Sequence, residues 1–256
     1  MKPCKDSAEF ADRFVSMGLS PGDVHRFLSP YLTQERLQRI DDVLSRRTDR
    51  VCVVLDNLYH EHNMSAVVRT MDAFGFQELH VIENITPFRP HKGIALGTQQ
   101  WITIVHHNSF EACISHLEGE GRVILAADPP DKAQPMGGSS RPAYPLTEIP
   151  VEPGQPLALV FGRELEGLHQ ELRDMTHGTF YIPLHGFVES LNVSVTVAVS
   201  LHEMRRKIDE LPEESWRINH EKEIFLRDLW CLNSVNRGWQ VLQEVVSRKE
   251  GSGKLS

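Results

Sequence analysis

The sequence predicts an α/β fold in which helices flank a mostly parallel sheet. Between residues 51 and 183, short apolar runs alternate with segments of helical periodicity, a pattern typical of strand–helix–strand units. The chain has 256 residues, of which 40% are apolar. This is enough for one sizeable hydrophobic core with short appendages.

Six apolar runs are expected to be strands. They lie at 51–55, 79–82, 101–105, 122–127, 157–161 and 179–183. Apolar residues between several of these runs recur at helical spacing: Val67, Val68, Met71 and Phe74, then Phe110, Cys113, Ile114 and Leu117, then Leu165, Leu168 and Leu172. Because such sheets bind ligands at the carboxyl ends of their strands, residues that directly follow a strand are the first candidates for a site.

The two ends of the chain are also predicted to be helical. Residues 1–50 are interrupted at Gly18–Pro21 and Ser29–Pro30, so we expect an extension of short helices without a core of its own. Residues 51–207 then form the α/β domain, and residues 208–256 are expected to be C-terminal helices.

Two segments have more than one interpretation. Residues 128–156 contain eight prolines and are expected to be a long loop, either a lid or binding element or a surface insertion without function. In residues 191–201, apolar side chains alternate with smaller or polar ones, which is typical of a strand. A wholly buried helix, which has no polar face, gives the same kind of sequence.

The formal net charge is -8, whereas a general nucleic-acid binder is typically basic. Basic residues nevertheless gather at 36–50 and 205–207, where an RNA site would be built. The four cysteines are far apart in the sequence and form no C-x-x-C pair, which predicts a reducing cytoplasm and no metal site. No run of 18 apolar residues occurs, so we expect a soluble cytoplasmic protein.

Two polar clusters follow predicted strands in residues 62–70 and 161–168. In the first, Asn63 suits a helix N-cap, and the spacing of Arg69 to residue 72 suits an ion pair. In the second, Gly162 permits close approach of a ligand to the backbone. Glu164 in the same cluster is expected to open a helix, where the helix dipole favours an acidic residue.

A third cluster occupies residues 182–195. Ser190 suits an N-cap of the segment that follows. However, Ser190, Asn192 and Ser194 lie beside a very apolar run, and buried polar groups there would need partners. The cluster is therefore compatible with a helix start and with a binding site.

Other motifs are absent or incomplete. The chain has no G-x-G-x-x-G, which argues against a nicotinamide dehydrogenase, and no G-x-S-x-G, which argues against a serine hydrolase. Residues 251–254 (GSGK) lack the upstream glycine of a phosphate loop. The pair His60 and His62 lacks the i, i+4 spacing of helical zinc ligands.

Taken together and in this order, the three clusters resemble motifs 1, 2 and 3 of the SpoU-type RNA ribose methyltransferases of the SPOUT superfamily. The resemblance covers residues 34–207 and is strongest in motif 3, IPLHGFVESLNVSVTVAVSLHE. The segment ERLQRIDDVLSRRTDRVCVVLDNLYHEHNMSAVVRT is similar to the TrmH-type branch, which methylates a D-loop guanosine of tRNA. The resemblance implies a sheet whose C-terminal part is threaded into a trefoil knot, an exception to the rule against knots.

The resemblance also implies a homodimer that uses S-adenosyl-L-methionine as its methyl donor, without a metal. It implies that residues 191–206 form a buried helix at the dimer interface. The implied activity is transfer of a methyl group to a ribose 2′-hydroxyl of tRNA. The alternatives are ribosomal RNA or another tRNA site as substrate, and a non-catalytic RNA-binding relative.

Site residues follow from the resemblance, position by position. The implied catalytic residues are Asn63, Arg69, Glu164, Ser190 and Asn192; those that contact the methyl donor are Ala127, Gly162, Ile182 and Leu191; those that grip RNA phosphate are Arg205, Arg206 and Lys207. Asn63 is implied to come from the partner subunit. Two positions that are often basic in the family hold Gln100 and Ile208.

Overall fold

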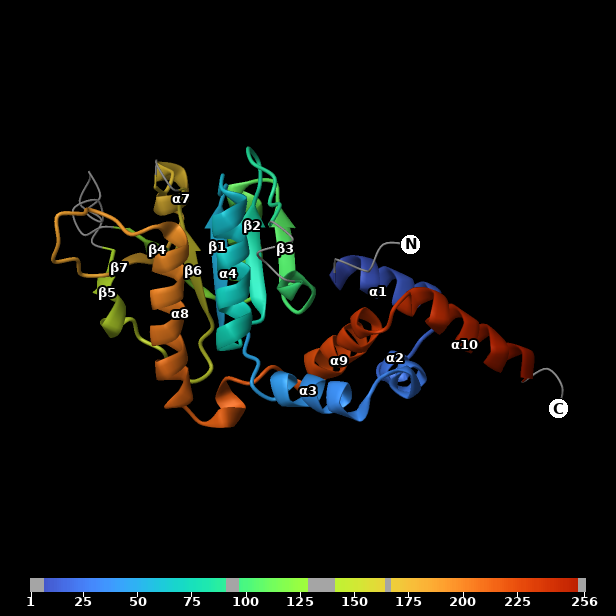
Figure 1. Cartoon of the computed structure of the whole chain (residues 1–256). Helices are drawn as coiled ribbons and strands as arrows, with labels where there is room; N and C mark the ends of the chain where they lie inside the picture. Colours follow the sequence, from blue (N-terminus) through green and yellow to red (C-terminus); the bar gives the residue numbers. More distant parts are fainter. Residues whose placement is uncertain (1–6, 91–96, 129–140, 164–166, 253–256) are drawn as a thin grey trace. The chain divides into compact units, whose positions relative to one another are not determined.

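The computed structural model describes residues 7–90, 97–128, 141–163 and 167–252. The chain divides into two compact units (Figure 1). The sheet unit spans Thr48–Arg217, and the terminal unit combines residues 1–47 with residues 218–256. Among the described residues, no helix has both the length and the apolar character needed to cross a membrane.

The sheet unit is built on seven strands in the order β3-β2-β1-β6-β4-β7-β5. Every pairing between neighbouring strands is parallel. The strands are β1 Val51–Asp56, β2 Glu78–Ile82, β3 Thr103–His107, β4 Val123–Ala127, β5 Ala143–Pro145, β6 Leu157–Phe161 and β7 Gly178–Tyr181. The predicted α/β fold with a mostly parallel sheet is thus confirmed, while the trefoil knot stays a prediction.

Two strand expectations need correction. The strand expected at 101–105 begins two residues later, at Thr103. A 3-10 turn at Thr98–Gln100 precedes it, and Trp101 is the C-cap of that turn. The segment 128–156 is not wholly a loop, since β5 lies within it and pairs with β7. Residues 129–140 of that segment lie outside the described residues.

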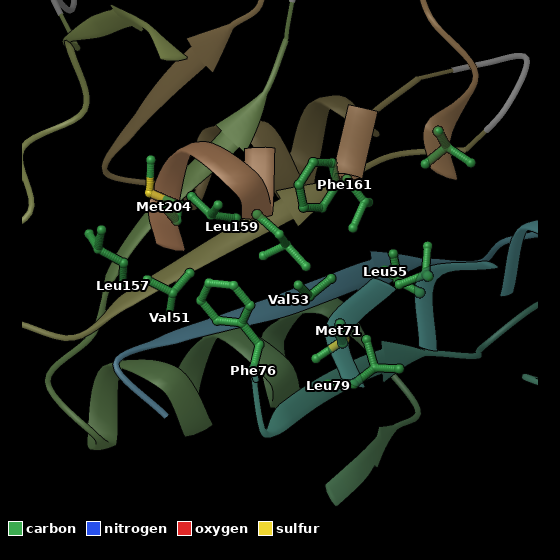
Figure 2. Close-up of a cluster of buried hydrophobic side chains, with 14 of the residues drawn as sticks. Val51, Val53, Leu55, Met71, Phe76, Leu79, Leu157, Leu159, Phe161 and Met204 are labelled. Atoms are coloured by element: carbon green, nitrogen blue, oxygen red, sulfur yellow. The ribbon is translucent and has the colours of Figure 1, made fainter. Parts of the chain in front are cut away.

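Helices α4 (Glu61–Phe74) and α8 (Val193–Asp209) cover one face of the sheet and lie side by side (Figure 1). Their apolar side chains meet alternate residues of β1 and β6 in a single core (Figure 2). Figure 2 labels members of this core from β1, β6 and the two helices, among them Val51, Val53, Leu55, Leu157, Leu159, Phe161, Met71 and Met204. Each such side chain, fully buried, stabilises the fold by about 1.5–3 kcal/mol.

The opposite face of the sheet packs against α6 (Phe110–Gly119) and α7 (Gln170–Asp174). Cys52 and Val54 of β1 point to this face, because successive residues of a strand alternate between faces. The helix expected to open at Glu164 instead begins at Gln170, with His169 at its N-cap, and Gly167 and Leu168 before it are not helical. Glu164 and Leu165 lie outside the described residues.

Residues 193–201 of the ambiguous segment belong to a helix, as the resemblance implied and the alternating pattern did not. Val193, Val197 and Leu201 are buried against the sheet. Val195 and Val199 are 45% and 40% exposed in the single chain, and burial of this helix at a dimer interface stays a prediction.

In the terminal unit, the helices expected at the two ends of the chain pack against each other. The unit contains α1 Ser7–Ser16, α2 Asp23–Leu28, α3 Gln34–Leu44, α9 His220–Ser234 and α10 Gly238–Ser252. The ring of Phe10 packs against Phe225 and Trp239, with ring centroids 5.2 and 5.9 Å apart. Buried Asp228 of α9 accepts hydrogen bonds from the backbone N–H groups of Gly22 and His25, at 2.8 and 2.7 Å. The apolar partners of Phe10 lie more than 200 residues later in the chain, which local periodicity does not reveal.

Candidate active site

Side chains from the first and third polar clusters meet in one chain. The side-chain amide of Asn192 donates a hydrogen bond to Oδ1 of Asn63 over 3.2 Å. Asn63 lies in the first turn of α4, and Asn192 directly precedes α8. The packing of α4 on α8 therefore brings together two residues that are 129 positions apart.

The helix starts correct two expectations. Asn63 is not the N-cap of its helix, because that position is held by His60. Ser190 is not the N-cap of α8, because Oδ1 of Asn192 accepts the hydrogen bond from the backbone N–H of Ser194 at 2.8 Å. The implied role of Asn63 toward the site of a partner subunit stays a prediction.

Arg69 lies six residues after Asn63 on α4, which places the two side chains about 120° apart around the helix. Asn63 is buried and Arg69 is exposed. The structure thus pairs Asn63 with Asn192 and presents Arg69 on the solvent side of the same helix. Ser190 is also exposed, in the segment between β7 and α8.

The residues expected to contact the methyl donor follow three neighbouring strands. Ala127 ends β4, Gly162 follows β6 and Ile182 follows β7. These strands are adjacent in the sheet, in the order β6-β4-β7, and run parallel, so their carboxyl ends lie at one edge. Ala127, Ile182 and Leu191 are half-buried. The edge therefore offers partly accessible apolar surface and backbone groups at the place where parallel sheets bind ligands.

Gly162 has a structural reason for lacking a side chain, besides the close approach of a ligand that the sequence predicts. A Cβ at this position would lie 2.5 Å from the backbone carbon of Gly167 and 2.5 Å from the backbone nitrogen of Leu168. The missing side chain lets the chain fold back on itself after β6, where the backbone of residue 163 exchanges hydrogen bonds with residue 167 at 3.0 and 3.2 Å. Gly162 thus shapes the loop after β6, which also contains Glu164 outside the described residues.

Sequence reasoning missed a buried polar group beside these loops. Arg163 is 7% exposed, and its Nε lies 4.0 Å from Oδ2 of Asp56, the last residue of β1. The side-chain amide of Asn57, at φ 46°, donates to Oδ1 of Asp56 at 2.7 Å and to Oδ1 of Asn84 at 2.8 Å. Each of Asp56, Asn57 and Arg163 comes at or just after a strand end, which is the signal that could have found them.

The three basic residues at the end of α8 are already engaged with protein groups. Arg205 pairs with Asp209 and lies over the ring of Trp216, 4.3 Å from its centroid. Lys207 donates to the backbone carbonyl of residue 149 at 2.6 Å. Arg206 is half exposed, and its carboxylate partners are also on the helix surface.

Comparisons with known proteins place the chain in a family. The family description SpoU rRNA Methylase matches residues 50–202. The tRNA (guanosine(18)-2′-O)-methyltransferase of Escherichia coli is 30% identical over 218 residues, covering 84% of this chain and 86% of that protein. The enzyme of the same name from Thermus thermophilus is 31% identical over 178 residues, covering 68% and 84%.

Solved structures agree with the sequence relatives. The A. aeolicus TrmH/SpoU tRNA modifying enzyme aligns with a TM-score of 0.63 and 27% identity, over 84% of this chain and 97% of that one. The SpoU methyltransferase AviRb from Streptomyces viridochromogenes, solved with AdoMet, aligns with a TM-score of 0.54 over 66% of this chain and 65% of that one. At 21% identity AviRb supports the fold alone. With the three clusters at the strand ends and helix starts described above, the chain belongs to the SpoU rRNA methylase family.

Proposed function

We propose that this chain is an S-adenosyl-L-methionine-dependent methyltransferase that modifies the ribose 2′-hydroxyl of guanosine 18 in tRNA. It works as a cytoplasmic homodimer. Relatives of that name share about 30% identity with it over most of both chains. The hydrogen bond between Asn63 and Asn192 carries the proposal, because it joins the first and third motifs of the family in one place.

We assign the methyl donor to the edge formed by the ends of β6, β4 and β7. Ala127, Ile182 and Leu191 offer half-buried apolar surface to it. Backbone N–H and C=O groups of the strand-end loops give the polar contacts that a cofactor pocket needs in small number. When bound, S-adenosyl-L-methionine supplies a sulfonium methyl group that is already a strong electrophile, so the protein has to act mainly on the nucleophile.

The ribose hydroxyl is a weak nucleophile and must be aligned and relieved of its proton. We assign the alignment to Asn192, Ser190 and Asn63, whose hydroxyl and amide groups lie at the start of α4 and α8. Asn63 and Asn192 orient each other through their hydrogen bond. Glu164, in the loop after β6, is assigned to hold the third-motif segment or the motif-1 arginine.

Arg69 is assigned to the hydroxyl itself. A guanidinium is ordinarily too basic to lose its proton, so Arg69 orients the hydroxyl and stabilises the negative charge that develops on its oxygen, as fixed positive groups do. The exposed position of Arg69 on α4 leaves it accessible to RNA. An RNA phosphate beside the reacting ribose assists Arg69 by holding its guanidinium in place, and the hydroxyl proton leaves to solvent.

The second subunit is inferred from an apolar stripe. Val195 and Val199 are one turn apart on α8 and are 45% and 40% exposed, and Phe187 before the helix is fully exposed. Exposed apolar patches of this kind mark interaction sites. A second copy of α8 would cover them, as a twofold interface requires the same patch on both subunits.

A methyl-transfer assay with chosen RNA substrates tests the proposal. The purified chain is given labelled S-adenosyl-L-methionine and unmodified tRNA, the same tRNA with 2′-deoxyguanosine at position 18, or ribosomal RNA. We expect transfer to the unmodified tRNA and none to the deoxy form, which lacks the accepting hydroxyl. Transfer to ribosomal RNA instead would establish the alternative substrate, and transfer to neither RNA would contradict the enzymatic function.

A further inference from the structure

A buried cluster of metal-ligating side chains lies on the face of the sheet that α6 covers. His80 of β2, His107 of β3 and Cys113 of α6 each offer one donor atom, and these atoms all lie within 4.8 Å of one another. His80 and Cys113 are fully buried and His107 is 7% exposed. The proposed methyl transfer uses none of them, since Asn63 and Asn192 belong to helices on the opposite face.

The two imidazoles are arranged around a shared proton. Nδ1 of His80 lies 2.9 Å from Nε2 of His107, and the ring planes are within 12° of each other. Nε2 of His80 lies 2.9 Å from Oε1 of Glu78. A carboxylate only accepts hydrogen bonds, so Nε2 of His80 carries a proton. Nδ1 of the same ring then carries a lone pair and accepts a hydrogen bond. The proton between the rings therefore belongs to His107, and it occupies the place where a cation would bind both nitrogens.

The surroundings of His80 match those of a metal-ligating histidine. Such a ring usually donates its other N–H to a carboxylate, which fixes its orientation, and Glu78 has that role here. Glu78 is in turn held by Arg122 at 3.2 Å. Arg122 is anchored to the backbone carbonyl of Asp49 at 2.9 Å. The ligand geometry is thus fixed before any ion binds.

A fourth ligand can come from the same helix. His116 follows Cys113 by three residues at the exposed margin of α6, where its Nε2 lies 3.4 Å from Oε1 of Glu120. One donor atom each of His80, His116 and Glu120 lie within 4.8 Å of one another. The ring centroid of His116 lies 5.3 Å from that of His80 and 5.5 Å from that of His107. Three imidazoles and one thiol make a donor set that suits zinc and excludes the oxygen-seeking ions calcium and magnesium.

We propose that His80, His107, Cys113 and His116 form a structural zinc site that ties α6 to β2 and β3. Binding of Zn²⁺ displaces the thiol proton of Cys113 to solvent as the Zn–S bond forms. The proton on Nε2 of His107 leaves that nitrogen for Nδ1 of the same ring, which frees the lone pair for the metal. The site combines residues from three elements, so the spacing of cysteines and histidines in the sequence does not predict it.

A thiol must lose its proton before it can bind a metal ion. Metal binding is therefore expected to release a proton and to tighten as the pH rises.

Cobalt titration of the full-length, chelator-treated chain tests the proposal. Co²⁺ bound by a thiolate in a tetrahedral site gives visible and near-ultraviolet absorption bands. We expect these bands to saturate at one Co²⁺ per chain, to vanish when Zn²⁺ is added, and to be accompanied by a rise in Tm. A folded wild-type chain that takes up no Co²⁺ in proportion to its concentration overturns the proposal.

Matched variants separate the site from its neighbourhood. Cys113→Ala and His107→Gln should lose the bands, and Glu78→Gln should weaken binding about 10- to 100-fold. Cys52→Ala and His106→Gln are the controls, since Cys52 is buried on the same face and His106 is the neighbour of His107. Binding that survives in Cys113→Ala, or that is lost equally in Cys52→Ala, contradicts the assignment. These readouts do not depend on methyl transfer, so they stand or fall apart from the proposed function.

Discussion

The side-chain amide of Asn192 and Oδ1 of Asn63 share a hydrogen bond of 3.2 Å, and Oδ1 of Asn192 at the same time caps α8 through the N–H of Ser194 at 2.8 Å. One side chain therefore has two roles that use different atoms. Its oxygen supports the helix, and its nitrogen supports the site.

Asn192→Asp should separate these roles. An aspartate keeps the oxygen that caps α8 but cannot donate to Asn63, so we expect a Tm near that of wild type and a kcat about 100-fold lower. Asn192→Ala should lose the cap as well, at about 1 kcal/mol of stability. Thermal unfolding and single-turnover methyl transfer check both variants. Full activity in Asn192→Asp would contradict the role assigned to the amide.

The contact between Asn63 and Asn192 also shows how far sequence reasoning reaches. The three clusters were found in the sequence because each follows an apolar run, and strand ends are where parallel sheets place their sites. The pairing of two particular side chains depends on how α4 packs on α8, and no local pattern encodes that packing. Motif position was therefore predictable, whereas the capping roles of Asn63 and Ser190 were assigned wrongly.

The same limit explains the terminal unit. Phe10 and Phe225 each lie on an apolar helix face, and periodicity identifies both faces. Their contact bridges 215 positions, and which faces meet across such a separation is decided by tertiary packing. Residues 193–201 show a different limit of periodicity. This helix has apolar side chains on two sides, Val195 among them, and the resulting alternating pattern cannot be told from that of a strand.

Arg69→Ala should strongly reduce turnover, because it removes the positive group that we propose to act on the ribose oxygen. We expect kcat to fall about 100- to 1000-fold, as for the loss of one transition-state donor. Arg69→Lys should remain impaired, because an ammonium lacks the planar fork of a guanidinium. Donor affinity by calorimetry and the oligomeric state should be unchanged, since Arg69 is on the solvent side of α4. Turnover that survives in Arg69→Ala would remove this residue from the mechanism.

Gly162→Ala should damage the loop after β6. The new Cβ would lie about 2.5 Å from backbone atoms of residues 167 and 168, so the loop must shift, at about 1–3 kcal/mol. We expect a lower Tm and weaker binding of the methyl donor. Gly119→Ala is the control, because a Cβ there meets nothing within 4 Å. Equal Tm values for the two variants would show that the loop accommodates the methyl group.

The exposed valines of α8 make a prediction about assembly. Replacing Val195 and Val199 with aspartate should convert the proposed dimer to a monomer in analytical ultracentrifugation, while the far-ultraviolet circular dichroism stays the same. Both side chains point away from the core, so their replacement leaves the chain folded. Val15→Asp, at a valine 75% exposed in α1, should leave the dimer intact. A wild-type chain that sediments as a monomer would contradict the dimer itself.

Arg206 is the residue of the basic triplet that we expect to bind RNA phosphate. Its guanidinium contacts Oε1 of Glu203 at 2.8 Å and Oε1 of Glu210 at 2.6 Å, but half of the side chain is exposed. Surface ion pairs of this kind contribute only about 0–1 kcal/mol, so a phosphate can take the place of a carboxylate. Arg205 instead lies over Trp216, and Lys207 holds a backbone carbonyl, so these two residues support the fold.

Arg206→Gln should therefore weaken tRNA binding and lower the slope of log K against log salt by about 1, the value for one lost phosphate contact. Arg205→Gln should lower Tm and leave that slope unchanged, because it removes a contact within the protein. Filter binding at several salt concentrations measures the slopes, and thermal unfolding measures the stabilities. If Arg205→Gln changes the slope and Arg206→Gln does not, RNA phosphate binds Arg205. The guanidinium of Arg205 must then leave the ring of Trp216 when RNA binds.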